Sequence, residues 1–402
     1  MPENLTRRTF LAGTAAVVAV VASACGAADD GPDPVPQPTA TTAAEPTPTQ
    51  GVIASPVAGY GVPTKWQGRT LTVAARGGDY QDAQNLAFFE PFAAATGVEI
   101  QVSSADTARM KDQVDQSAVT WDVMMFPAEE VIQLARGNYL EPIDYAVVDK
   151  TPLVPDIVLQ YGVGADFFST VILYAAGADH APQSWADFWD VEPPKAGAEL
   201  EPASARALRK NPVGTLEFAL LADGVAVDRL YPLDVERAFA SLQRIKANVA
   251  VWYEDGKLPV ELVVAKQVAM ASAWNVRPWQ LHATDEVRFE WYGGMLSADV
   301  WVSPRGAPNR DIAMDFINFA TRAPPSANFA RLAPYGPVNA ESFPLLRPDR
   351  AAGNPSAPVN RSVQFVQNWN WWADNLDAIT LRFDDWLLQD TTPATPAVTP
   401  TV

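Results

Sequence analysis

The sequence predicts an α/β protein built as two lobes with a ligand cleft between them. Three observations support this fold class. Short apolar strands alternate with amphipathic helices, two such sets follow each other along the chain, and the 402 residues exceed the roughly 150 that one domain needs. Hydrophobic residues make up 48% of the chain, which is typical of a globular protein.

The first set of elements follows a proline-rich N-terminal region. Residues 69–75 and 98–102 are predicted strands, and residues 80–95 between them carry apolar side chains at three- and four-residue spacing, which predicts a helix. A helix over 107–117 leads to the apolar run 121–126, which is typical of a buried parallel strand. This alternation with short links predicts right-handed crossovers and a parallel sheet.

The second set begins with a predicted strand over residues 169–175. It continues with helices over 215–222, 233–247 and 260–266, strands over 268–274, 287–291 and 298–302, and a helix over 310–322. We therefore expect lobe 1 over residues 66–172 and lobe 2 over residues 173–298, while residues 299–390 return to lobe 1 and add C-terminal helices. Ligands of open α/β sheets lie at the carboxyl ends of the strands.

The first 25 residues are typical of an export signal. Arg7 and Arg8 match the twin-arginine pattern, and the apolar run 10–24 is too short to span a bilayer as a stable helix. The run ends in ASAC at 22–25, which resembles a lipobox with alanine where Leu, Val or Ile is preferred, so we expect lipidation of Cys25. The alternative is ordinary cleavage, since Ala-Ser-Ala also fits a secretory peptidase.

Residues 26–65 and 391–402 are rich in proline, threonine and alanine and carry few charges. Such segments bury too little apolar surface to offset chain entropy, so we expect a disordered stalk and a disordered tail. The formal net charge of −18 disfavours binding to nucleic acid, which needs clustered Lys and Arg. One cysteine excludes an internal disulfide, and with two histidines we expect no zinc site, no other metal and no cofactor.

Catalytic motifs are few, and we expect no enzyme. The chain has no G-x-S-x-G elbow, Walker loop or G-x-G-x-x-G motif, and His180 and His282 are isolated. Carboxylate pairs at 129–130 and 384–385 are of the kind that a glycosidase needs. Adjacent residues on a helix point in different directions, however, which favours a solvated face for each pair.

Binding features are better represented. Gly77-Gly78 lies between a predicted strand and helix, where backbone N–H groups can face an anion, and Arg76 adds a guanidinium suited to a carboxylate or phosphate. The alternative is a plain strand-to-helix turn. Trp274 ends an apolar strand, and Asp299 lies inside another. A carboxylate there needs a partner such as a ligand amine, unless it faces water at the strand end.

Nine stretches in chain order resemble the solute-binding proteins of ABC importers, specifically the spermidine/putrescine-binding branch. They are LTVAARGGDY (71–80), AFFEPFAAATGV (87–98), WDVMM (121–125), LEPIDY (140–145), SWADFWD (184–190), GTLEFALLADG (214–224), VAMASAW (268–274), DVWVSP (299–304) and YGPVN (335–339). The resemblance covers nearly all of residues 70–389. It implies a monomer with a type II periplasmic-binding-protein fold, which closes by a hinge on a solute and delivers it to an ABC permease.

The resemblance also implies ligand-binding positions. The branch has aromatic residues at the positions of Arg76 and Tyr80, of which this chain keeps the second. Trp274 falls where a tryptophan stacks on the alkyl chain of the amine, Asp299 where an aspartate pairs with an ammonium, and Glu129 in a loop that faces the ligand.

The branch has a second acidic cluster that corresponds to residues 205–214. This chain has Arg206, Arg209 and Lys210 there and no carboxylate. A polyamine such as putrescine or spermidine therefore fits no better than a solute with one amine and one acidic group. Asp299 and Trp274 would then hold the cation, and Arg76 with the Gly77-Gly78 amides the anion.

We therefore expect an extracytoplasmic substrate-binding lipoprotein, anchored to the membrane through Cys25, that carries an amine-containing solute to an ABC permease. A soluble periplasmic or secreted protein is the alternative location. The alternative functions are a carbohydrate receptor that uses tryptophans as sugar platforms and an extracellular glycosidase. A ferric-ion receptor would favour paired tyrosines, and no Tyr-Tyr occurs.

Overall fold

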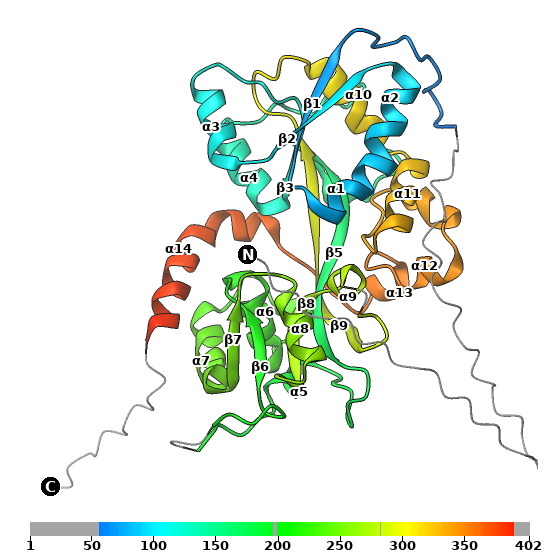
Figure 1. Ribbon diagram of the computed structural model, residues 1–402. Coiled ribbons are helices and arrows are strands. Elements are labelled where there is room, and N and C mark those ends of the chain that lie inside the picture. Colours follow the sequence, from blue (N-terminus) through cyan, green and yellow to red (C-terminus); the bar gives the residue numbers. More distant parts are fainter. Residues whose placement is uncertain (1–55, 196–198, 282, 390–402) are drawn as a thin grey trace, which may run out of the picture. The chain divides into compact units, whose positions relative to one another are not determined.

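Two long strands organise the structure, a computed structural model that describes residues 56–195, 199–281 and 283–389. β5 (Gly162–Ala175) and β9 (Val287–Val302) pair antiparallel, and register shifts interrupt their pairing twice. Figure 1 shows the other elements gathered around the two ends of this pair. We call the group with β1–β3 lobe 1 and the group with β6–β8 lobe 2.

In lobe 1, β1 (Thr70–Ala75) lies parallel to β2 (Glu99–Ser104), and β3 (Met124–Pro127) lies antiparallel to β9. The parallel crossover that the sequence predicts is confirmed, since Val73 also forms a parallel bridge with Val123. The helices of this lobe are α1 (Gly78–Gln84), η1 (Asn85–Phe89), α2 (Glu90–Thr96), α3 (Thr107–Asp115), α4 (Ala128–Arg136), α10 (Arg310–Ala320) and α11 (Ala323–Leu332).

The helix predicted over residues 80–95 contains a wider turn. α1, η1 and α2 follow each other without a break, and η1 is a π-helical turn. Pro91 lies in the first turn of α2 and has no N–H to donate to residue 87, which is a local reason for the altered ladder. Gly97 ends the helix in the left-handed conformation, with φ of 75°.

In lobe 2, β6 (Arg206–Arg209) lies parallel to β7 (Val249–Tyr253) and β8 (Met270–Trp274), and β8 pairs antiparallel with β5. The helices are α5 (Trp185–Trp189), α6 (Pro212–Ala222), α7 (Val235–Ile245), α8 (Leu258–Val264) and α9 (Arg277–Gln280). The smaller elements of the chain are η2 (Pro155–Ile157), β4 (Val158–Leu159), η3 (Val227–Arg229), η4 (Lys246–Asn248), η5 (Ala340–Leu345), α12 (Pro348–Ala352), α13 (Pro358–Arg361) and β10 (Phe365–Val366).

The two strands predicted over residues 287–291 and 298–302 are one strand in the structure. The intervening Gly293 and Gly294 break the apolar pattern, and Gly293 has a positive φ of 69°. β5 nevertheless continues beside β9 across this point, with one of the two register shifts located there. A glycine inside a strand pattern is typical of such a bulge.

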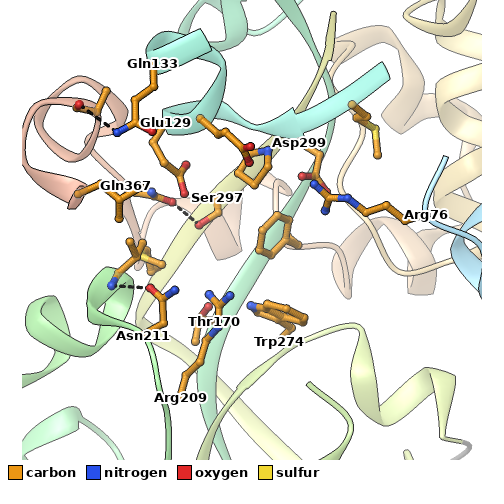
Figure 2. Close-up of a pocket in the computed structure, with 18 of the residues that line it drawn as sticks. Arg76, Glu129, Gln133, Thr170, Arg209, Asn211, Trp274, Ser297, Asp299 and Gln367 are labelled. Atoms are coloured by element: carbon orange, nitrogen blue, oxygen red, sulfur yellow. Dashed lines mark hydrogen bonds between the residues drawn. The ribbon is translucent and has the colours of Figure 1, made fainter. Parts of the chain in front are cut away.

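The C-terminal helix α14 (Trp369–Leu388) contacts both lobes. Trp372 and Phe383 are fully buried in the hydrophobic cluster of lobe 2, so this C-terminal helix, which the sequence predicts after the return to lobe 1 without placing it, packs on lobe 2 as well. On its other side, Arg136 of α4 forms an ion pair with Asp374 at 2.6 Å, and Gln133 donates a hydrogen bond to α14 that is drawn in Figure 2. Among the described residues, no helix combines the length and apolar character of a membrane span.

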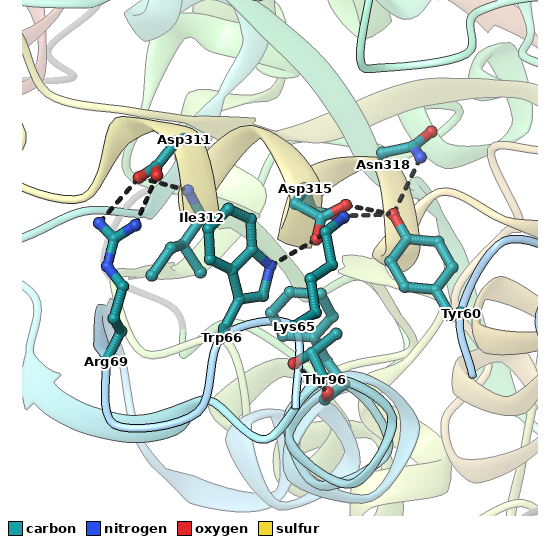
Figure 3. Close-up of polar contacts among 10 residues, drawn as sticks. Tyr60, Lys65, Trp66, Arg69, Thr96, Asp311, Ile312, Asp315 and Asn318 are labelled. Carbon is teal, nitrogen blue, oxygen red and sulfur yellow. Dashed lines mark hydrogen bonds and ion pairs between the residues drawn. The ribbon is translucent and has the colours of Figure 1, made fainter. Parts of the chain in front are cut away.

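The folded domain begins earlier in the chain than the sequence analysis predicts. The predicted stalk extends to residue 65, yet Tyr60 and Lys65 already contact Asp315 of helix α10, followed by Trp66 (Figure 3). The aromatic side chains of Tyr60 and Trp66 contact the buried Asp315 carboxylate, and the proline content of this segment does not predict these contacts. The predicted signal peptide with Cys25, residues 26–55 of the stalk, His282 and the tail 391–402 lie outside the described residues.

Asp315→Asn should lower the free energy of unfolding by about 2–4 kcal/mol, because a buried charge that accepts several hydrogen bonds is expensive to disrupt. The carboxylate accepts from Tyr60 at 3.0 Å, from Lys65 at 2.8 Å and from Trp66 at 2.6 Å. The matched control is Asp311→Asn on the same helix, whose ion pair with Arg69 is largely exposed and should contribute less than about 1 kcal/mol. Urea denaturation measures both, and equal losses would contradict the prediction.

Candidate ligand-binding site

A cavity of about 940 Å³ is lined by residues of both lobes, of β5 and β9 and of α14. The five ligand-binding residues that the resemblance implies all line it: Arg76, Tyr80, Glu129, Trp274 and Asp299. They come from positions up to 223 residues apart in the chain, and the fold brings them to one place (Figure 2). The predicted set of residues is therefore one cluster in space.

Asp299 forms the acidic part of the cavity. It lies on β9 directly opposite Asp166 of β5, and its side chain accepts no hydrogen bond from the residues that the structure describes. Burial raises the pKa of Asp299 above its usual range, and the Arg76 guanidinium acts in the opposite direction. Figure 2 shows Arg76 beside Asp299. An acidic group with one nearby cation and free acceptor capacity suits a further cation from a ligand.

Aromatic rings line the cavity on both sides, with Tyr80 near Asp299 and Trp274 near Arg209. Tyr80 packs edge-to-face against Tyr335 at 4.9 Å between ring centroids, and Trp274 packs similarly against Phe168 at 6.0 Å. The Tyr80 hydroxyl already donates to the Asp166 carboxylate, so a solute in the cavity would contact the ring of Tyr80 and not its hydroxyl. Such walls suit the methylene groups of a solute and, next to a carboxylate, its ammonium.

Two arginines form a basic part of the cavity that the sequence analysis did not select as ligand-binding. Arg209 and Arg277 lie over the Trp274 ring, at 5.0 and 4.7 Å from its centroid. The Arg277 guanidinium donates to Gln280 at 2.6 Å, whereas the Arg209 guanidinium has no hydrogen bond or ion pair within the described ranges. Figure 2 shows Arg209 and Trp274 across the cavity from Arg76 and Asp299.

The other two basic residues of the predicted segment lie elsewhere. Arg206 is buried and donates to the backbone carbonyl of Phe188 at 2.9 Å. Lys210 is exposed and forms an ion pair with Glu254 at 2.9 Å. Arg206 and Arg209 are three positions apart on β6, so strand alternation points their side chains to opposite faces, whereas Lys210 lies after the end of the strand. The sequence shows that this segment departs from the acidic pattern, but it does not show which arginine lines the cavity.

The structure corrects the proposed anion site at Gly77-Gly78. Gly77 lines the cavity, but its N–H donates to the side chain of Gln81 at 3.0 Å, and Gly78 is not among the lining residues. Arg76 lies on the acidic side with Asp299, so its charge is partly offset there. The geometry therefore favours Arg209 over Arg76 and the glycine amides as the position for an anionic group.

Polar side chains of α4 and of the segment before α14 complete the wall. Glu129 and Glu130, interpreted from the pattern as a solvated helix face, both line the cavity. Burial raises the pKa of Glu129 to about 7. The Ser297 hydroxyl donates to Gln367 at 2.8 Å, and the Gln367 amide nitrogen is buried without a partner among the described residues. By contrast, the pair Asp384-Asp385 is exposed on α14, as expected.

A glycine in the loop after β7 determines where the Trp274 ring can lie. A Cβ atom at Gly256 would lie 2.7 Å from the Trp274 ring and 3.0 Å from the Arg277 guanidinium. The Trp274 ring and the Arg277 guanidinium can therefore lie against the backbone at residue 256 only because glycine has no side chain. No motif marks this glycine in the sequence.

Comparisons with known proteins agree with this architecture. Residues 87–359 match the family model described as bacterial extracellular solute-binding protein. A γ-aminobutyric acid-binding protein of Pseudomonas aeruginosa is 32% identical over 330 residues, which cover 80% of this chain and 91% of that protein. The spermidine/putrescine-binding periplasmic protein of Escherichia coli is 22% identical over 303 residues, which cover 71% of this chain and 82% of that protein.

A solved structure of the Atu4243–GABA receptor is also similar. It is 34% identical with a TM-score of 0.72, and the match covers 80% of this chain and 98% of that chain. These relatives are binding proteins and not enzymes, and they have the two-lobe type II fold expected from the resemblance. The chain therefore belongs to the bacterial extracellular solute-binding proteins, the extracytoplasmic receptors that deliver small solutes to the membrane permeases of ABC importers.

Proposed function

We propose that this receptor binds a small solute with one ammonium and one carboxylate group, such as γ-aminobutyrate. The observation that carries the proposal is the pair of opposite charges in one cavity. The Asp299 carboxylate accepts no hydrogen bond, and the Arg209 guanidinium has no acceptor, among the residues that the structure describes. A solute with both charges would supply the missing partner to each.

The energetic reason is the cost of leaving charges partly buried and without hydrogen-bonding partners. A buried charge is stabilised when it is paired and hydrogen-bonded and is costly otherwise. Arg209 could bind a carboxylate with two parallel N–H···O bonds, which is the geometry that a guanidinium favours. The ammonium at Asp299 would also lie near the ring of Tyr80, with a cation–π attraction of about 0.5–2 kcal/mol.

The same charges disfavour a polyamine. A second ammonium that extended across the cavity from Asp299 would meet Arg209 and Arg277, where like charges repel. The similarity to two γ-aminobutyrate-binding proteins at 32–34% identity, against 22% for a polyamine-binding protein, supports the same choice. Binding would favour the closed arrangement of the lobes, which the permease would then recognise.

Isothermal titration calorimetry of the purified protein tests the proposal. We expect γ-aminobutyrate to bind, putrescine and spermidine to bind more weakly, and maltose to give no heat of binding. Butyrate and n-butylamine, which each lack one of the two charges, should bind more weakly than γ-aminobutyrate. Binding of maltose alone would support a carbohydrate receptor, and preferred binding of putrescine would support a polyamine receptor. Either result would overturn the proposal.

We also propose that the receptor is tethered to the membrane by lipidation of Cys25. The support is the position of the chain's single cysteine at the end of the signal-like segment. In a bacterial host that exports it, Cys25→Ser should release the protein from the membrane fraction into the soluble extracytoplasmic fraction. Fractionation with immunoblotting measures this. Equal distribution of both forms would contradict lipidation, and ligand binding by the purified soluble domain serves as the control for folding.

A further inference from the structure

A second buried carboxyl group lies next to Asp299 but is not itself a lining residue of the cavity. Asp166 of β5 is 1% exposed, and it is the direct cross-strand partner of Asp299 in the antiparallel pair of β5 and β9. Residues that face each other across such a pair have Cβ atoms about 4.5–5.5 Å apart, so their side chains interact. The fold therefore holds two carboxyl groups side by side, one at the cavity surface and one below it.

The hydrogen bonds around Asp166 leave one of its oxygens without a partner. One carboxyl oxygen accepts from the Tyr80 hydroxyl, whereas the other is buried and has no hydrogen-bonding partner within the described ranges. Arg76 acts electrostatically on both aspartates, but it forms no ion pair with either among those residues. Two buried carboxylates with only one nearby cation, which pairs with neither of them, would repel each other strongly.

We propose that Asp166 and Asp299 share one proton before a solute binds, and that the solute ammonium displaces this proton when it binds at Asp299. The inference rests on the function proposed above. The only bond that breaks is an O–H bond of the carboxyl pair, and the proton passes to water or buffer. The ammonium keeps its own protons and replaces the lost positive charge, so the charge of the site is unchanged. Asp166 acts through Asp299 and is a positioning residue.

The electrostatics of the site support a shared proton. Burial, and after it the neighbouring Asp299, raise the pKa of Asp166 well above its usual range, while the Tyr80 hydroxyl and Arg76 lower it. Two acids that interact this strongly lose their protons in separate steps that belong to the pair. Other titratable or charged groups face this pair from Tyr80 of α1, Arg76 after β1, Tyr335 after α11, and Glu129 and Glu130 of α4.

The expected sign follows from linkage. If binding releases a proton, the affinity for the solute rises with pH while the pair is protonated, by up to about tenfold per pH unit, and becomes constant above the pKa of the pair. The solute cannot cause this change, because an alkyl ammonium and a carboxyl group titrate near about pH 10 and pH 4 respectively. Glu129 is the competing source, since its pKa is about 7 and it lines the same cavity.

The experiment is isothermal titration with γ-aminobutyrate from about pH 5 to about pH 8, at each pH in two buffers that both have capacity there and differ in their heats of ionisation. The wild-type protein and the Glu129→Gln variant should both release protons on binding. Asp166→Asn should release none and show nearly constant affinity over this range. A purely structural role for Asp166 would instead lower the affinity by the same factor at every pH.

A second variant keeps the inference testable if Asp166→Asn does not fold. Tyr80→Phe removes the hydroxyl that stabilises the ionised Asp166, so the rise in affinity should move to higher pH while proton release remains. Wild-type binding without proton release would overturn the inference and leave the proposed function intact. Loss of proton release in Glu129→Gln would also overturn it, by assigning the proton to Glu129. Absence of γ-aminobutyrate binding would overturn both.

Discussion

Arg209→Gln is expected to weaken the binding of γ-aminobutyrate by at least about 30-fold, which corresponds to about 2 kcal/mol. Glutamine retains hydrogen-bonding capacity but loses the positive charge and the two parallel N–H donors that suit a carboxylate. The solute carboxylate would then be desolvated against the Trp274 ring without a counter-charge. Calorimetry or intrinsic tryptophan fluorescence measures the change.

Lys210→Gln is the matched control for this prediction. It removes one positive charge from the next residue in the chain, but Lys210 is exposed and pairs with Glu254 instead of lining the cavity. Its affinity for γ-aminobutyrate should stay within about twofold of the wild type, since exposed pairs contribute little. On the ligand side, 4-aminobutanamide lacks the carboxylate and should bind the wild type and Arg209→Gln with similar, weak affinity. Equal losses in Arg209→Gln and Lys210→Gln would contradict the assignment of the anion site.

Asp299→Asn should weaken the binding of γ-aminobutyrate by tenfold or more. The amide keeps the size of the side chain, but it removes the negative charge that would bind the ammonium and places an N–H donor in its place. A hydrogen-bonded charge pair that is truncated on one side typically loses about 2–5 kcal/mol of binding free energy. The variant also leaves Arg76 beside a neutral group, which adds repulsion against an incoming cation.

The controls for Asp299→Asn distinguish the loss of a negative charge in the cavity from the loss of one negative charge elsewhere on the protein. Asp349→Asn makes the same change at an exposed residue of α12 that pairs with Arg347, and it should leave the affinity unchanged. Butyrate, which has no ammonium, should bind the wild type and Asp299→Asn similarly. Unchanged affinity of Asp299→Asn for γ-aminobutyrate would remove Asp299 from the site, while Arg209→Gln would still test the other half of the proposal.

Many of the helices and strands can be predicted from the local sequence, because they depend on the spacing of apolar residues and on the residues that begin and end each element. The strand at 70–75 and the helices α3, α7 and α10 lie within a few residues of their predicted ends. The apolar spacing of these elements and the N-caps of α3 and α7, Asp106 and Asp234, act over a few residues, as does Gly97 at the end of α2. The continuous β9 could not be predicted in this way, because its pairing with β5 across the two glycines is a long-range interaction.

The residues of the site also differ in whether the sequence alone identifies them. The sequence alone marks Trp274 and Asp299 as candidates, through the carboxylate inside an apolar strand and the family resemblance, and both residues line the cavity. The sequence contained Arg206, Arg209 and Lys210 but did not distinguish their roles, because the direction of each side chain depends on how β6 packs between β7 and β8. The fold is needed to show that Arg209 alone among these three residues lines the cavity and that Asp166 lies beside Asp299. Cross-strand register joins positions 133 residues apart, and no local pattern encodes it.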